Sequence, residues 1–301
     1  MIKATVTIGI PAYNEEKNIL LILKDLKNQV RNNFSIEKII IANDCSSDNT
    51  VAVIKSLQDK KIQIIGGKNR RGQAYRQNQI IKNTKTDILV LLNADIRITN
   101  QGFLNKLVEP IVSQNVDLAS TFPSPHRAST GSLLTRILET SVLIQNNIFR
   151  KLKDGNSIYT CHGRARAMSS HFYKTLEFKE SIGEDAYSYL VCISKSFKYR
   201  SILDASIKYY LPATLRDYVR QSARFNMNRV ILSKHFPVDL VTSELHIPMY
   251  LTLTETFNML IKKPVLTILY ILINLLVRFS TRRDEDHNIW KISNSTKGIK
   301  V

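Results

Sequence analysis

Cysteine is scarce in this sequence, and its few copies are not placed for a disulfide framework or a zinc site. Cys45, Cys161 and Cys192 are the only cysteines in 301 residues, and no two of them form a Cys-x-x-Cys pair. An odd number of widely spaced cysteines excludes a disulfide-stapled scaffold and favours a reducing compartment. The N-terminal stretch MIKATVTIGIP is too short and too strand-like for a secretory signal peptide. We therefore expect a cytoplasmic protein.

Acidic residues are also scarce relative to basic ones. The chain has 25 Asp and Glu against 43 Lys and Arg, which gives a formal net charge of +18. Such an excess suits nucleic acid, an anionic membrane surface or a phosphate-bearing substrate. The sequence contains no recognised RNA- or DNA-binding motif, so we expect no nucleic-acid partner.

Long apolar runs are missing as well. The longest, Val265–Phe279, falls short of the roughly 20 residues of a spanning helix, and Asn274 interrupts it. A second apolar stretch, Ile247–Leu260, precedes it. The basic residues that flank the two stretches are Lys262, Lys263, Arg278, Arg282 and Arg283. We expect an amphipathic or re-entrant helix lying peripherally at the inner face of the cell membrane. The alternatives are a helix buried in the protein or in an oligomer interface, and, third, a true span.

The remainder of the chain alternates apolar strands with amphipathic helices. Strands are expected at Thr5–Pro11, Glu37–Asn43, Lys61–Ile65, Asp87–Leu92 and Val116–Phe122, with an extended segment at Ser201–Tyr210. Helices are expected at Glu15–Asn28, Gly72–Asn83, Phe103–Ser113, Leu133–Ile148, Glu184–Ile193 and Leu215–Lys234. This rhythm predicts an α/β fold: a Rossmann-like, mostly parallel sheet flanked by helices, with hydrophobic or amphipathic helices at the C-terminal end.

Polar clusters follow the strands at the points where they end. They are Tyr13-Asn14-Glu15, Asn43-Asp44, Lys68-Asn69-Arg70-Arg71 and Asn93-Ala94-Asp95. Ligands bind outside the carboxyl ends of the strands in open α/β sheets, so we expect these clusters to converge on one cleft. Asp44 can accept a hydrogen bond from a pyrimidine N–H or a ribose hydroxyl. Gly72 begins a helix beside arginines and lets the backbone approach phosphate oxygens.

Six stretches carry a resemblance to a known family. TIGIPAYNEEKNI, ANDCSSDNT, KNRRGQAYRQNQII, DILVLLNADI, GEDAYSYLVC and QSARF occur in the order expected of a family 2 inverting glycosyltransferase. That family has a V/I-P-x-Y-N-E start, a D-x-S-x-D-x-T turn, an N-x-G helix start, a D-x-D strand end, an E-D pair and sometimes Q-x-x-R-W. The combined order is more specific than any single motif. The resemblance implies the GT-A fold.

The resemblance implies a nucleotide-diphospho-sugar donor and assigns residues to it. The nucleotide pocket would comprise Pro11, Tyr13, Glu15 and Asp44, with Asp44 on the base. The diphosphate and ribose side would be lined by Asn69, Arg71, Gly72 and Arg76. At the D-x-D position, Asp95 would hold Mg²⁺ or Mn²⁺ against the diphosphate, with Asn93 replacing the first acid. Asn93 can still donate or accept there at lower charge, so we expect weaker or less selective metal binding.

The same resemblance assigns the acceptor side. Asp185 would be the base that removes the acceptor proton, while Glu184 is also explained as a helix-start acid. Gln221 and Arg224 lie one helical turn apart and would grip the acceptor or the diphosphate, with Phe225 in place of the family's Trp. The implied substrates are a UDP- or GDP-sugar and a glycan or lipid-linked acceptor.

Two hypotheses follow. In the first, residues 1–235 form a catalytic domain in which 1–123 bind the nucleotide-sugar and 124–235 the acceptor, and residues 236–301 associate with a membrane or oligomerise. In the second, the chain is a catalytically reduced relative that binds a nucleotide-sugar or a membrane as a partner protein. Asn93 and Phe225 support the second hypothesis, whereas the retained carboxylates Asp44, Asp95 and Asp185 support the first.

Overall fold

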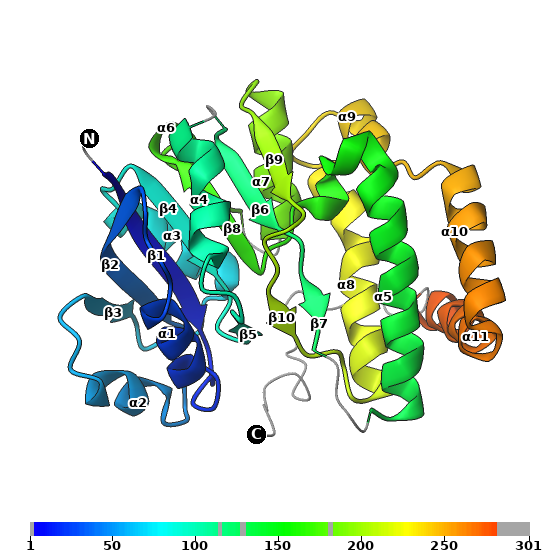
Figure 1. Cartoon of the computed structure of the whole chain (residues 1–301), viewed down its shortest axis with the longest axis horizontal. Coiled ribbons are helices and arrows are strands. Elements are labelled where there is room, and N and C mark those ends of the chain that lie inside the picture. Colours follow the sequence, from blue (N-terminus) through cyan, green and yellow to red (C-terminus); the bar gives the residue numbers. More distant parts are fainter. Residues whose placement is uncertain (1–2, 114–115, 127–130, 180–182, 282–301) are drawn as a thin grey trace. The chain divides into compact units, whose positions relative to one another are not determined.

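The computed structural model describes residues 3–113, 116–126, 131–179 and 183–281. These residues form two compact units, and each unit combines two separate stretches of the chain. The first unit contains the described residues of 3–124 and 160–209. The second contains those of 125–159 and 210–281 (Figure 1).

A seven-stranded sheet forms the centre of the first unit, in the order β3-β2-β1-β4-β8-β6-β9 (Figure 1). The strands are β1 Ala4–Ala12, β2 Phe34–Asn43, β3 Ile62–Gly66, β4 Ile88–Leu92, β6 Leu118–Thr121, β8 Ala165–Ser169 and β9 Tyr199–Ile202. β1 runs parallel to β2 and β4, β2 to β3, and β6 to β9. β8 is antiparallel to both of its neighbours, β4 and β6. The expected α/β fold with a mostly parallel sheet is confirmed.

Burial on both faces explains why the central strands are continuous apolar runs. Every residue of β4 is buried, and so are Val6, Ile8 and Ile10 of β1. The helices of the first unit are α1 Ile19–Lys27, α2 Thr50–Ser56, α3 Gln73–Asn83, α4 Phe103–Ser113, α6 Ser170–Tyr173 and α7 Glu184–Ser194. Three short strands complete the strand list: β5 Ile96–Arg97, β7 Ser124–Pro125 and β10 Lys208–Tyr209, of which β5 and β10 pair antiparallel.

Some element ends differ from the sequence predictions. α1 begins at Ile19 and not at Glu15, because the carbonyl of Glu15 accepts from the N–H groups of Asn18 and Ile19 in a turn that precedes the helix. β1 continues through Pro11 to Ala12. The extended segment expected at Ser201–Tyr210 is divided between β9 and β10.

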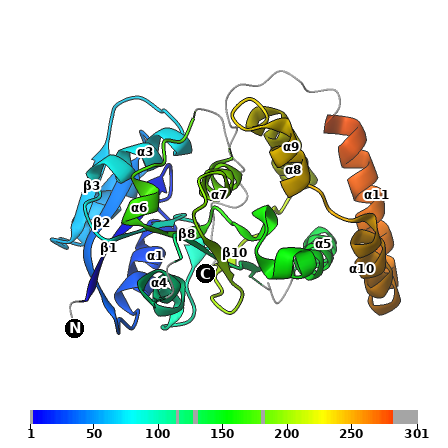
Figure 2. The same cartoon turned by 90° about the horizontal axis from the view of Figure 1, so that it is seen from above.

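Helices build the second unit. They are α5 Leu133–Lys151, α8 Leu215–Leu232, α9 Val238–Glu244, α10 Met249–Lys262 and α11 Pro264–Thr281. α11 packs on α5, α8 and α10, and α10 packs on α5 (Figure 2). The compact units therefore do not divide at residue 235 as expected, because α5 and α8 precede that residue and pack with the C-terminal helices. The functional division at residue 235 stays a prediction.

One membrane alternative concerns the length and apolar character of the helices. Among the residues described, no helix is both long and apolar enough to cross a membrane. Of the flanking basic residues named in the sequence analysis, the side chain of Arg278 and all of Arg282 and Arg283 lie outside the description.

Candidate active site

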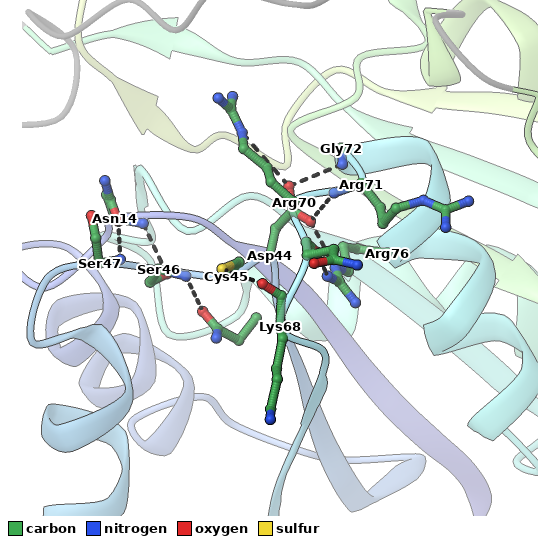
Figure 3. A network of polar contacts seen from close by, with 12 residues as sticks. Asn14, Asp44, Cys45, Ser46, Ser47, Lys68, Arg70, Arg71, Gly72 and Arg76 are labelled. Carbon is green, nitrogen blue, oxygen red and sulfur yellow. Dashed lines mark hydrogen bonds and ion pairs between the residues drawn. The ribbon is translucent and has the colours of Figure 1, made fainter.

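The carboxylate of Asp44, directly after β2, is the centre of a polar network (Figure 3). Its Oδ1 accepts from the backbone N–H of Arg71 and from Arg76 Nε, both at 2.8 Å. Its Oδ2 accepts from the N–H of Gly72 at 3.0 Å, and Arg70 Nε lies 4.0 Å away. Gly72 precedes α3 with φ at 87°, a backbone conformation that favours glycine. The N-terminus of a helix favours a negative charge, and at α3 the carboxylate of Asp44 supplies it.

Arg76 fixes this carboxylate from within the protein. Its side chain is buried, and its other two nitrogens donate to the carbonyl of Asn69 and to Gln79 Oε1, both at 2.7 Å. The placement of Arg76 on the diphosphate and ribose side stays a prediction. Its observed contacts hold the carboxylate of Asp44 and the turn before α3 in place.

Two other arginines of the same turn stack on tyrosine rings. Arg70 lies over the ring of Tyr13, 4.3 Å from its centroid, and Arg71 lies over Tyr75 at 4.4 Å. The guanidinium of Arg71 points away from Asp44, and its contact with that residue is made by the backbone (Figure 3). The turn after β1 and the turn before α3 therefore meet at Tyr13 and Arg70.

The turn after β1 is tied to the turn after β2. The N–H of Asn14 donates to Ser46 Oγ at 3.0 Å, and the N–H of Ser47 donates to Asn14 Oδ1 at 2.9 Å (Figure 3). Glu15 is buried, donates its N–H to Thr50 Oγ1 and accepts from Asn18 Nδ2 at 2.7 Å. The polar ends of β1 and β2 thus form one hydrogen-bonded surface, with the carboxylate of Glu15 in contact with its own turn.

The end of β4 adds the next part of the site. Asn93 Oδ1 lies 3.4 Å from Gln73 Nε2, at the start of α3. Asp95 is partly exposed, and within the described part of the chain its carboxylate has no hydrogen-bond or ion-pair partner. No group of three or more His, Cys, Asp or Glu side chains is placed to hold a metal ion among residues 3–113, 116–126, 131–179 and 183–281. A metal ion here would have to bind to few protein ligands.

The loop before β8 joins the end of β4 to the start of α7. The carbonyl of Arg164 accepts from the N–H of Asn93 at 2.9 Å, and its guanidinium lies 3.8 Å from the centroid of the Tyr209 ring. The N–H of Gly163 donates to Asp185 Oδ2 at 3.3 Å. A Cβ at position 163 would lie 3.4 Å from that oxygen, which is an ordinary van der Waals contact, so the approach of the loop to the carboxylate does not require glycine. Asp185 and Asn93 are therefore held on two sides of one loop.

Arg166 is a residue of this site that the predictions from the sequence do not include. It is fully buried in β8, where it donates to the carbonyl of Glu184 and to Ser188 Oγ, both at 2.7 Å, and to Gln77 Oε1 at 3.1 Å. It therefore connects α3 to the first turn of α7. The available signal was an arginine alternating with small apolar residues in the strand sequence ARAMS.

His162, in the same loop, is neutral. Burial and, to a lesser extent, the positive charge of Arg164 together lower its pKa to about 3. Its ring packs edge-on against Phe122. A neutral imidazole adds no positive charge beside a diphosphate, so we interpret His162 as a structural residue.

Residues predicted for the acceptor lie in different units. Glu184 and Asp185 begin α7 of the first unit, where Glu184 is buried. Gln221 lies on α8 of the second unit, and the side chains of Arg224 and Phe225 are outside the described ones. The described site therefore comprises the ends of β1, β2 and β4, the start of α3, the loop before β8 and the start of α7.

Solved structures show the same fold. A mannosyltransferase from Pyrobaculum calidifontis in complex with GDP-Man and Mn²⁺ superposes with a TM-score of 0.65 at 13% identity, over 95% of this chain and 89% of that one. Glucosyl-3-phosphoglycerate synthase from Mycobacterium tuberculosis, with Mn²⁺, UDP and phosphoglyceric acid, gives 0.56 at 15% identity, over 81% and 80%. The GT-A fold implied by the sequence is confirmed.

The sequence comparisons agree with the fold. A dolichyl N-acetyl-alpha-D-glucosaminyl phosphate 3-beta-D-2,3-diacetamido-2,3-dideoxy-beta-D-glucuronosyltransferase from Methanococcus voltae is 27% identical over 239 residues, 73% of this chain and 71% of that protein. The family model of glycosyl transferase family 2 matches residues 7–176, which span every strand of the central sheet except β9. The chain belongs to glycosyl transferase family 2.

Proposed function

We propose that the protein is an inverting glycosyltransferase that moves a sugar from a UDP- or GDP-linked donor to a glycan or lipid-linked acceptor. The observation that carries this proposal is a series of hydrogen bonds that links the turns after β1 and β2, the start of α3, the end of β4 and the loop before β8 to Asp185. It lies at the carboxyl ends of the parallel strands, where open α/β sheets bind ligands.

The donor nucleotide would bind beside Tyr13 and Asp44. Asp44 Oδ2 accepts one short hydrogen bond from Gly72, and a carboxylate oxygen can accept two. Asp44 Oδ2 is therefore able to accept a second hydrogen bond from an N–H of the base, while Tyr13 offers a ring on which the base can stack. The positive charges of Arg70 and Arg71 in the adjacent turn would oppose the charge of the diphosphate.

A divalent metal ion fits the end of β4. Asp95 supplies a carboxylate without a partner in the described part of the chain, and the Asn93 amide oxygen lies nearby in sequence. Mg²⁺ and Mn²⁺ accept one or two protein carboxylates and take their other ligands from phosphates and water. When bound, the ion would neutralise charge on the departing diphosphate. The metal-containing complexes of the two solved transferases support this assignment.

Asp185 would act as the base. Gly163 and Ala186 donate to its two oxygens and fix the orientation of the carboxylate, and its side chain remains partly exposed. It can accept the proton of an acceptor hydroxyl as that oxygen attacks the sugar from the face opposite the diphosphate. Direct attack of this kind inverts the anomeric configuration.

The glycosyltransferase from M. voltae, whose name specifies a dolichyl-linked acceptor, supports a lipid-linked substrate for this protein. A lipid-linked substrate in turn supports peripheral attachment at the inner face of the cell membrane.

Turnover with a panel of UDP- and GDP-sugars and Mn²⁺ tests the proposal. Asp185→Asn should lower kcat by about 10²- to 10⁴-fold, the usual contribution of a general base. Asp95→Ala should abolish the turnover that depends on Mn²⁺. Glu37→Gln, at an exposed acid of β2, is the matched control and should retain full activity. Proton NMR of the product reports the anomer. Retained configuration would overturn the inverting mechanism, and no turnover across the panel would favour the catalytically reduced relative.

A further inference from the structure

The outer sides of α10 and α11 form an unusually apolar surface. Eleven of the nineteen exposed large apolar side chains among the described residues lie on these two helices. They are Met249, Tyr250, Leu253, Phe257 and Ile261 on α10, and Val265, Ile268, Ile271, Leu272, Leu275 and Leu276 on α11. We call this set the apolar face. A clustering of this kind marks an interaction site, because isolated exposed apolar residues are scattered on ordinary surfaces.

The apolar face lies on a different side of α10 from the residues that pack against α5. Leu251, Glu255 and Met259 recur every four residues and are buried, and the two apolar ones share a core cluster with Ile144 and Ile148 of α5. Glu255 Oε1 accepts from Lys151 Nζ at 2.6 Å. Leu253 and Phe257, on the outer side, are 63% and 61% exposed. The packing of the second unit therefore does not account for the outer side chains.

The exposed charged side chains described between residues 249 and 277 have one sign. Residues 249–281 contain a single acid, Glu255, which is buried on the inner side. Lys262 and Lys263 are exposed at the junction of the two helices. Arg136 and Lys263 also line a hollow of 290 Å³ beside the first turn of α11, together with Glu139, Pro264, Val265 and Leu266. Cations at the border of an apolar surface suit the phosphates of lipid headgroups.

We propose that the apolar face docks on a bilayer that contains anionic phospholipid, with α10 and α11 lying in the plane of the interface. The apolar side chains would enter the acyl boundary, and Lys262, Lys263 and Arg136 would contact headgroup phosphates. A second copy of the chain is a poorer occupant, because the apolar face carries no exposed carboxylate to pair with the lysines of another copy. The proposal rests on the proposed function and deepens it by naming the surface that attaches the enzyme to the membrane.

Vesicle co-sedimentation of the full chain tests this docking. Vesicles with about 30% phosphatidylglycerol should bind the protein more tightly than pure phosphatidylcholine, and about 0.5 M NaCl should reduce the difference. The double variant Leu253→Glu/Phe257→Glu should lower the partition coefficient by at least about tenfold, since it places charge where apolar burial is expected. Lys262→Gln/Lys263→Gln should lower binding by about fivefold per lysine on the anionic vesicles, with little change on neutral ones.

Val238→Glu is the matched control, because Val238 is 60% exposed on α9 of the same unit but lies outside the apolar face. It should bind vesicles like the unsubstituted protein. Circular dichroism and stabilisation by UDP with Mn²⁺ show whether each variant is folded and keeps its nucleotide site, so failure of docking is distinguishable from failure of the proposed function. Absence of binding to anionic vesicles, or full binding by the Leu253→Glu/Phe257→Glu variant, would overturn the proposal. So would a dimer in sedimentation velocity that this variant converts to a monomer.

Discussion

Arg166 shows how a single buried side chain can connect two parts of a site. Its guanidinium donates to Gln77, Ser188 and the carbonyl of Glu184, next to Asp185. Arg166→Ala would leave these acceptors without their donor, and we expect a loss of about 3–5 kcal/mol in the free energy of unfolding. Urea denaturation measures it. Arg216→Ala, at an exposed arginine of α8, should change stability by no more than about 0.5 kcal/mol.

A conservative change separates positioning from stability. Arg166→Lys retains the positive charge but cannot reproduce the fork of donors. If Arg166 positions Asp185, kcat should fall while the KM for the donor stays constant, and the pH profile of kcat should change. A variant that loses stability but keeps kcat and its pH profile would show that Arg166 is structural only.

Asn93 is the second residue whose chemistry can be tested alone. Asn93→Asp restores a carboxylate beside Asp95, and the added negative charge should tighten Mn²⁺ binding in the presence of UDP by about threefold to tenfold. Isothermal titration calorimetry measures the change. Asp95→Ala in the same background should remove the gain. An unchanged affinity for Mn²⁺ in Asn93→Asp would show that the side chain at position 93 contributes nothing to binding of the ion, either directly or through a bridging water.

The position of an individual residue could be predicted where it directly follows a recognisable element of the sequence. Asp44 follows an apolar strand, so its position at a strand end could be read from the sequence. Its partners could not, because Arg71 and Arg76 are 27 and 32 residues away and β3 intervenes. Arg166 could not be predicted for the same reason, since its partner Gln77 lies 89 residues earlier. The sequence indicates which residues are polar at strand ends, and the fold decides which of them meet.

At the scale of elements, the ion pair between α5 and α10 predicts a pH dependence. The hydrogen bond from Lys151 holds the pKa of Glu255 below its ordinary value of 4.5, against the opposing effect of burial. A carboxyl group with a lowered folded-state pKa stabilises the fold above pH 4.5, and this contribution is lost as the pH falls through the folded-state pKa. Glu255→Gln should therefore cost about 1 kcal/mol at pH 7, and the difference from the unsubstituted protein should shrink below the ordinary pKa of glutamic acid.

Urea titrations between neutral pH and acid measure this difference. Glu177→Gln is the control, because its pair with Lys179 is exposed and should contribute almost nothing at any pH. A Glu255→Gln penalty that persists unchanged into acid would mean that the ion pair does not hold α10 on α5.

Elements were predictable to the extent that their pattern is local. Ile19, Ile22, Leu23 and Leu26 predict the buried side of α1, yet the helix begins late because the Glu15 carbonyl closes a turn first. The segment Tyr159–Ser169 could be read only as a strand or a loop. Its strand, β8, lies antiparallel between β4 and β6, and its place depends on residues that are distant in sequence.

For the whole molecule, the arrangement of the chain in two units could not be predicted from composition. The chain leaves the first unit near residue 125, returns near 160 and leaves again near 210, and no low-complexity linker marks these crossings. α5 joins the C-terminal helices through Ile144 and Ile148, which pack with Leu251 and Met259. An amphipathic pattern shows that a helix has an apolar side but does not name the element that covers it.

This arrangement also predicts how the molecule responds to a nucleotide. The residues assigned to the donor, from Pro11 to Asp95, lie in the first unit, so ligand binding should stabilise that unit by mass action. UDP or GDP with Mn²⁺ at about 100 times Kd should contribute about 2.7 kcal/mol and raise Tm by roughly 5–10 °C. Asp44→Asn should lose most of this shift relative to its own unliganded Tm, because the amide no longer holds the turn before α3 or accepts from the base in the same way. Val238→Glu should keep it. A shift that needs no metal and survives Asp44→Asn would place nucleotide binding elsewhere in the molecule.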